Sequence, residues 1–143
     1  MKTRGDARPS SSTPAAASPG AAGYDETLVR TSAQARRAVH RALASCSPIS
    51  PSQVDDLILV ASELVTNALR HAGGVTAFAI GVGRDSVTVS VSDASPQTPR
   101  YARHRDLRPG GFGWPIVLRL CRQVTLDVRP DGKTVHAVVP LDR

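Results

Sequence analysis

Two segments in the first half of the chain repeat apolar residues at the spacing of an amphipathic helix. The first, 32–45, follows Thr31, which is placed to act as an N-cap, with Gln34 completing a capping box. Its residues expected to be buried are Ala35, Ala38, Val39, Ala42 and Leu43. Pro48 and Pro51 then break the pattern, so the second segment forms a separate helix.

This second helix is expected to begin at Pro51, with Ser50 as its N-cap and Gln53 completing a second capping box. Its buried stripe is expected to comprise Val54, Leu57, Ile58, Ala61, Leu64, Val65, Ala68 and Leu69. Gly73 and Gly74 end the helix, because glycine tolerates the left-handed backbone of a helix C-terminus.

Alternation of apolar with small or polar residues predicts strands. They are, in chain order, 27–30 as a first edge strand, 75–82, 86–93, 124–128 and 134–140. Residues 114–122 should form a short helix, and 94–112 a connection long enough to be interpreted as a lid or binding loop. Because helices and strands do not alternate regularly, we expect an α+β two-layer sandwich, in which a mixed, mainly antiparallel sheet carries helices on one face.

Length and composition bound the organisation of the chain. Its 143 residues suit one domain, expected over 24–143, while 1–23 are rich in Ser, Ala, Pro, Gly and Arg and predict a disordered tail. The two cysteines lack metal-binding or redox spacing, and we interpret them as free thiols in a reducing cytosol. Neither a membrane helix nor a signal peptide is recognisable, so the expected localisation is cytoplasmic, without a membrane partner.

The formal net charge of +6 favours an acidic partner: nucleotide phosphates, nucleic acid, anionic lipid or an acidic protein surface. Aromatic residues make up only 3%, which disfavours nucleic-acid binding by base stacking. Four arginines and a histidine crowd the expected lid, opposed only by Asp106. They are Arg100, Arg103, His104, Arg105 and Arg108. They form either a solvated loop or a group that meets phosphates or an acidic partner.

Glu63 and Asn67 lie one turn apart on the second predicted helix, at the border of its buried stripe. A carboxylate and a carboxamide so placed suit a hard cation, an activated water or hydroxyl, or both. The alternative is a solvated polar face. Because asparagine is a mediocre helix former, its position in the helix interior favours a side-chain task.

Three further segments add candidate chemistry. Asp93 ends an apolar strand and could accept a hydrogen bond from an exocyclic amine such as that of adenine, or instead cap the following turn. The glycines of 110–113 precede a helix and could bring backbone N–H groups to an anion, or act as a lid hinge. Thr134 opens the last strand, where it either places its hydroxyl beside Asp93 or merely favours the hairpin.

Together the segments ELVTNALRHA, VSDASP, GGFGWPIV and DGKTV resemble the N box, two glycine-region boxes and the terminal Thr-containing box of the GHKL ATPases. This superfamily includes histidine kinases, Hsp90, MutL and gyrase B. The resemblance spans roughly 24–141 and implies the Bergerat ATP-binding fold. Length and the short lid narrow it to the stand-alone anti-sigma-factor serine/threonine kinases related to SpoIIAB and RsbW, of the actinobacterial type.

The resemblance implies a role for each position. Glu63 would be the catalytic general base and Asn67 would bind Mg²⁺. Asp93 would accept from the adenine amino group, with Thr134 supporting it through water. The implied cofactors are therefore ATP and Mg²⁺.

The second glycine-region box would bring the backbone amides of Gly111 and Gly113 to the ATP phosphates. It departs from the family, which usually has Arg and Leu where this chain has Phe112 and Trp114. Loss of the arginine removes a possible phosphate contact. For Trp114 we favour a place in the core over one at an interface.

Members of the family phosphorylate a serine or threonine of a STAS-type anti-anti-sigma partner and bind a sigma factor in competition. The resemblance implies the same activity and partners here, and a homodimer. The departures leave open a non-catalytic module that binds ATP and gates the binding of a sigma factor or other protein. A third alternative, a basic nucleic-acid-binding protein, is motivated by charge alone, and direct nucleic-acid binding is not expected.

Overall fold

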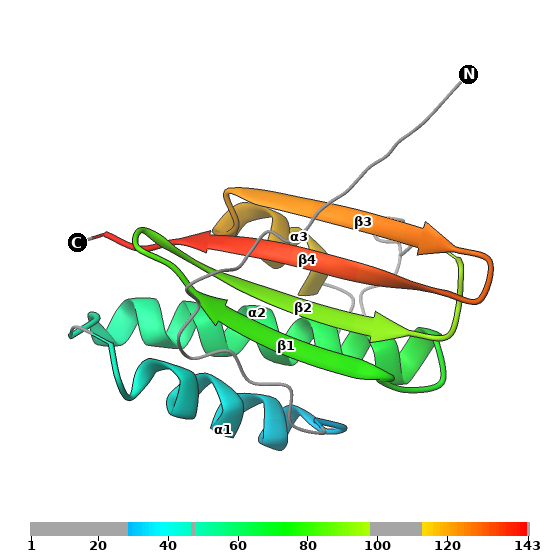
Figure 1. Cartoon of the computed structure of the whole chain (residues 1–143), viewed down its shortest axis with the longest axis horizontal. Coiled ribbons are helices and arrows are strands. Elements are labelled where there is room, and N and C mark those ends of the chain that lie inside the picture. Colours follow the sequence, from blue (N-terminus) through cyan, green and yellow to red (C-terminus); the bar gives the residue numbers. More distant parts are fainter. Residues whose placement is uncertain (1–28, 47, 98–112, 143) are drawn as a thin grey trace.

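The computed structural model of the chain describes residues 29–46, 48–97 and 113–142. Its elements are α1 (Ser32–Leu43), α2 (Pro51–His71), β1 (Ala77–Val82), β2 (Ser86–Asp93), α3 (Gly113–Leu120), β3 (Gln123–Arg129) and β4 (Gly132–Pro140). Figure 1 shows them as two layers, with the sheet above α1 and α2.

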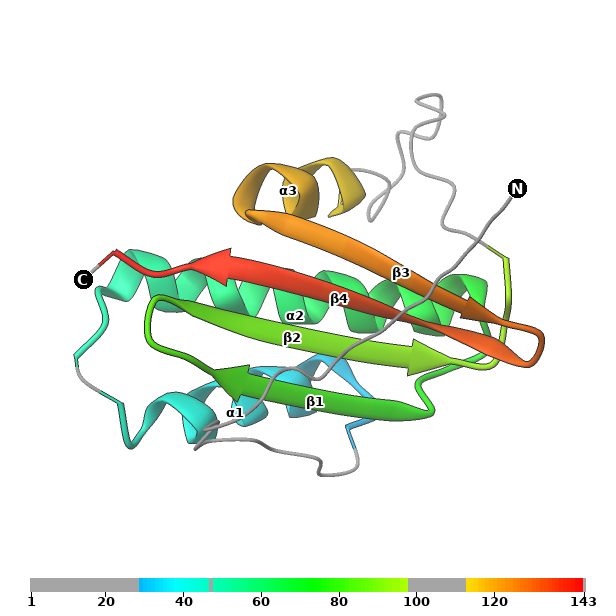
Figure 2. The same cartoon turned by 45° about the horizontal axis from the view of Figure 1, so that its top comes forward.

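The strands pair in the order β1-β2-β4-β3, and every pairing among the described strands is antiparallel. Helix α1 packs against β1, α2 packs against β2 and β4, and α3 packs against α2. The turned view in Figure 2 shows the sheet in front of α1 and α2, so these two helices cover one face. Among the described elements no helix covers the other face, which we call the open face. The prediction of an α+β sandwich with helices on one face is confirmed.

The two central strands divide their side chains between the two faces by strict alternation. On β2, the buried side chains are those of Val87, Val89, Val91 and Asp93. On β4, the corresponding residues are Lys133, Val135, Ala137 and Val139. Side chains of a strand point alternately to opposite faces, so one charged residue on each strand is placed on the helix-covered side.

The helix caps are largely those expected. Thr31 forms a capping box with Gln34, and the Ser50 hydroxyl accepts from the Gln53 backbone N–H. The second capping box is wrong in one respect. The Gln53 side chain reaches across to the end of β4 instead, where it donates to the Pro140 carbonyl and accepts from the Asp142 N–H. It therefore ties the start of α2 to the C-terminal strand.

Helix α2 buries Leu57, Val60, Ala61, Leu64, Val65 and Ala68. The expected stripe omitted Val60 and wrongly included Leu69, whose side chain is 45% exposed. The helix ends as predicted, because Gly73 and Gly74 have positive φ and the Gly74 N–H donates to the Ala68 carbonyl.

Strands and helices otherwise match their predicted bounds to within about two residues, as element ends usually do. The exception is the first edge strand, because Val29 and Arg30 belong to no strand and 27–28 lie outside the described residues. The predicted tail at 1–23 and most of the predicted lid also lie outside the described residues.

Cys46 and Cys121 are free thiols, as expected. Trp114 is buried, as predicted. In the described part of the chain, no helix is long and apolar enough to cross a membrane.

Candidate functional site

Glu63 lies in the C-terminal half of α2, directly before the buried Leu64. Its side chain is half-buried, and the buried Oε1 atom has no hydrogen-bond partner among the described residues. Burial raises the pKa of this carboxyl above its ordinary value, while the positive charge of Arg70 acts to lower it. An unpartnered buried acceptor is costly, so this oxygen is available to a proton or a cation.

Asn67 follows Glu63 by one helical turn and is also half-buried. No group of three or more His, Cys, Asp or Glu residues in the described part of the chain could hold a metal ion by itself. Mg²⁺ commonly uses one or two protein ligands and completes its shell with water and substrate phosphates. An amide oxygen beside an unpartnered carboxylate oxygen therefore fits Mg²⁺ that arrives with a nucleotide.

Helix α3 packs against α2, the helix that carries Glu63 and Asn67. Trp114 and Val117 anchor it in the core, at 9% and 0% exposure. Gly113 is its first residue, while Gly111, Phe112 and the predicted lid arginines lie outside the described residues. The proposed phosphate contacts at the glycine box thus stay a prediction, and the described geometry fixes only the helix that follows it.

Asp93 ends β2 and makes a buried ion pair with Lys133, its directly paired residue on β4. Lys133 Nζ lies 3.0 Å from Asp93 Oδ2 and 3.1 Å from Oδ1, and it also donates to the Ser95 carbonyl at 3.1 Å. The Ser95 N–H donates to Asp93 Oδ1 at 2.9 Å. Asp93 is thus both the turn cap that was weighed as an alternative and one half of an ion pair that was not predicted.

Gly132 permits the hairpin to approach the end of β2. A Cβ atom at this position would overlap the Asp93 carbonyl oxygen and lie 3.2 Å from the Ala94 Cα. Glycine is the residue that allows such a close backbone approach. This contact holds Lys133 beside Asp93.

Thr134 does not lie beside Asp93, and the predicted support of Asp93 by its hydroxyl is wrong. Thr134 pairs with Ser92 and its side chain lies on the open face, where Thr134 Oγ1 is 2.8 Å from Ser92 Oγ and 3.2 Å from Arg129 Nη2. A shift of one residue along a strand moves a side chain to the other face. Lys133 therefore holds the position that had been assigned to Thr134.

The sequence did contain a signal for Lys133. It stands two residues before Val135 and four before Ala137, on the period that marks the buried face of the strand. Thr134 stands out of this period. The sequence alone does not indicate which residue of β2 Lys133 contacts.

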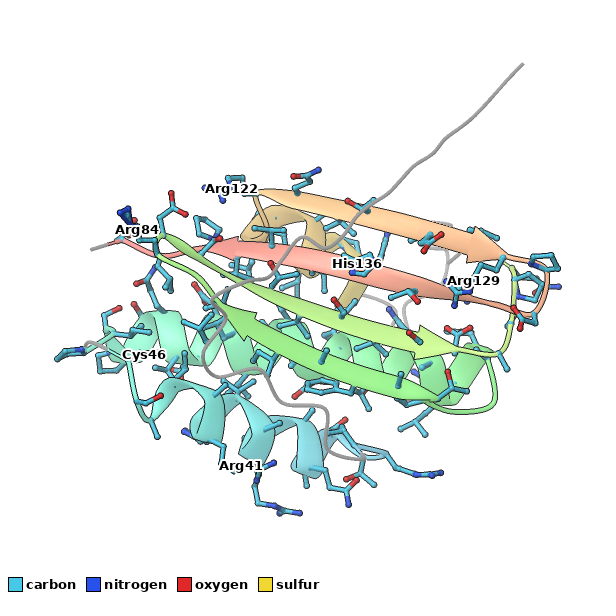
Figure 3. All side chains as sticks on the ribbon, in the orientation of Figure 1. Arg41, Cys46, Arg84, Arg122, Arg129 and His136 are labelled. Carbon is cyan, nitrogen blue, oxygen red and sulfur yellow. The ribbon has the colours of Figure 1, made fainter. Side chains whose placement is uncertain are left out.

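The open face has a polar row of its own. Ser90 Oγ lies 2.8 Å from His136 Nδ1. Burial lowers the pKa of His136, Asp127 acts to raise it, and Arg129 acts to lower it further. Figure 3 shows Arg129 near the β3–β4 turn and His136 further along β4. These contacts explain the polar alternation of β2 and β4 and lie on the face opposite to Asp93.

The helix pair and the strand-end pair lie at the same end of the molecule. Figure 1 shows the C-terminal half of α2, which carries Glu63 and Asn67, beneath the end of β2, which carries Asp93. The segments that carry three of the predicted site residues thus lie on the helix-covered side of the sheet, whereas the Thr134 side chain lies on the open face.

The family model described as histidine kinase-like ATPase domain matches residues 26–139 of the chain. No curated protein matches the chain significantly. The matched range contains all the described helices and strands except Pro140, the last residue of β4, and it includes Glu63, Asn67, Asp93 and Lys133.

Proposed function

Since the chain belongs to the histidine kinase-like ATPase domain family, we propose that it binds ATP with Mg²⁺ and acts as a protein serine/threonine kinase of the anti-sigma-factor type. Its substrate would be a serine or threonine of a STAS-type anti-anti-sigma protein, and a sigma factor would compete for the same kinase, which would act as a homodimer. The observation that carries the catalytic part of this proposal is Glu63 Oε1, a buried carboxylate oxygen without a partner among the described residues.

Phosphoryl transfer requires positioning and charge neutralisation more than covalent chemistry from the protein. Glu63 Oε1 accepts the proton of the attacking hydroxyl, and its raised pKa makes it a stronger base than an exposed glutamate. Asn67 would hold Mg²⁺ through its side-chain oxygen. When bound, Mg²⁺ offsets the negative charge of the β- and γ-phosphates.

The test is a time course of γ-phosphate transfer to the STAS proteins of the same organism. Glu63→Ala should abolish transfer and leave ATP binding largely intact, because the glutamate acts on the hydroxyl and not on the nucleotide. Asn67→Ala should remove the Mg²⁺ dependence of ATP binding, which calorimetric titration with and without Mg²⁺ measures. Asp55→Asn, on an exposed turn of the same helix, is the control for both.

Undiminished transfer by Glu63→Ala would refute the catalytic assignment. Equal Mg²⁺ dependence of wild type and Asn67→Ala would refute the metal assignment. Both variants should fold, because neither substitution removes a residue of the buried stripe of α2.

The alternative is a non-catalytic module whose binding to a sigma factor or other protein depends on ATP. The observation that favours it is the glycine box, where Phe112 and Trp114 stand in place of the Arg and Leu that are usual in the family. ATP binding with no transfer to any STAS partner, together with partner binding that changes on adding ATP, would select this alternative.

A further inference from the structure

Resting on the proposed nucleotide site, we propose that Lys133 is a base-reading residue, which allows guanine as well as adenine nucleotides to bind at the Asp93 end of the site. Lys133 and Asp93 are the charged residues among those described that are buried, at 6% and 5% exposure. Asp93 lies directly before the exposed Ala94, where the chain leaves the sheet.

A lone carboxylate distinguishes the two purines by its hydrogen-bonding character. It accepts from the 6-amino group of adenine, which is a donor. In the same pose guanine presents its O6 atom, which is an acceptor and is repelled by the carboxylate. A site that contained Asp93 without Lys133 would therefore select adenine.

The ammonium of Lys133 allows guanine a second pose, shifted by one ring atom, in which O6 faces the ammonium and N1–H faces the carboxylate. It supplies a donor about one hydrogen-bond length from the acceptor, so the pair can match any base edge that has a donor and an acceptor on adjacent atoms. On adenine these are the 6-amino group and N1. On guanine they are N1–H and O6, and donation by lysine to guanine O6 or N7 is among the commonest specific base contacts.

Both partners keep hydrogen-bonding capacity for a ligand. The ammonium has three N–H groups, of which one serves the Ser95 carbonyl and one can be shared by the two Asp93 oxygens. Asp93 Oδ1 accepts from the Ser95 N–H and from Lys133, whereas the described contacts of Oδ2 involve Lys133 alone. One N–H of Lys133 and one lone pair of Oδ2 are thus available side by side.

The pair is also held rigidly enough to discriminate. Asp93 and Lys133 are paired positions of two central strands, and the close approach of Gly132 fixes the distance between their backbones. A buried ion pair rarely gains stability over apolar side chains of similar volume. Its presence at the base end of the site is therefore better explained by ligand recognition than by folding.

The test compares ADP and GDP, each with Mg²⁺, by calorimetric titration of the full chain. For wild type, the two dissociation constants should agree within about tenfold. Lys133→Met keeps the length of the side chain and removes the ammonium, so it should weaken GDP relative to ADP by about tenfold or more. Arg129→Met is the matched control: it removes one positive charge from the same hairpin, but on the open face, and should leave the ratio unchanged.

Binding of ADP without measurable binding of GDP by wild type would overturn this inference and leave the proposed function standing. Tighter ADP binding by Lys133→Met, with an unchanged GDP to ADP ratio, would also overturn it, because the ammonium would then only block the carboxylate. Failure of wild type to bind either nucleotide would overturn the proposed function itself. If Lys133→Met does not fold, the ratio of the GDP and ADP dissociation constants of the wild type still tests the inference.

Discussion

Lys133 Nζ lies 3.0 Å from Asp93 Oδ2, at directly paired positions of β4 and β2, and both side chains are almost fully buried. The carboxylate at the predicted base end of the site therefore already has a cationic partner. The next residue, Thr134, points to the opposite face. In the proposed site, the base of a nucleotide would meet a donor and an acceptor together.

Loss of the carboxylate should destabilise the fold strongly. Asp93→Asn leaves a buried ammonium without a counter-charge, and we expect the free energy of unfolding to fall by about 3 kcal/mol in urea denaturation. Asp127→Asn is the control, because its ion pair with Arg129 is exposed and should contribute less than about 1 kcal/mol. Equal losses in the two variants would contradict the burial of the Lys133–Asp93 pair.

The close approach at Gly132 makes a second stability prediction. Gly132→Ala places a Cβ against the Asp93 carbonyl oxygen, so the hairpin must shift, at a cost of about 1–3 kcal/mol. In Gly83→Ala the nearest atom, the Ser86 carbonyl oxygen, lies 3.4 Å away, and the change should be much smaller. Thermal unfolding of both variants measures the difference, and similar melting temperatures would argue against the contact.

Glu63→Gln should stabilise the protein while removing transfer. The pKa of Glu63 is raised mainly by burial, so the folded state holds its proton more tightly than the unfolded state. Wild-type stability therefore falls as pH rises from about 4.5 through the raised pKa. A neutral glutamine avoids this loss, and at pH 7 we expect a gain of up to about 1 kcal/mol in unfolding free energy, limited because the side chain is only half-buried.

The matched control for this variant is Asp55→Asn, which removes the same charge from an exposed position near the start of α2. It should change stability by less than about 0.5 kcal/mol, because surface substitutions away from caps and buried contacts have small effects. A Glu63→Gln protein that is less stable than wild type at pH 7 would show that Glu63 has a stabilising partner.

His136 should make the protein less stable in mild acid. Its pKa is lowered mainly by burial, so between the ordinary value of 6.5 and the lower folded value the unfolded state binds the extra proton. Stability is thus retained above pH 6.5 and decreases as pH falls through this window. Denaturation of His136→Gln at a series of pH values should show a flatter profile there, and replacement of the exposed His40 is the control.

The helices could be predicted closely because their signals are local. Thr31 and Gln34 form the capping box, and Gly73 supplies the left-handed backbone that ends α2. The errors arose where a side chain has a distant partner. The Gln53 side chain forms hydrogen bonds with the C-terminal strand instead of its own helix end. Leu69 follows Val65 at helical spacing, yet its side chain is exposed.

By itself, the sequence determined the helices, the strands and the placing of Glu63 and Asn67 on one face of α2, because periods of 3.6 and 2 residues are properties of the local chain. Only the tertiary structure decided which residue meets Asp93. The register of β4 against β2 brings Lys133 to that carboxylate and turns Thr134 away. Such a register depends on packing between strands distant in sequence, and a step of one residue exchanges the two faces.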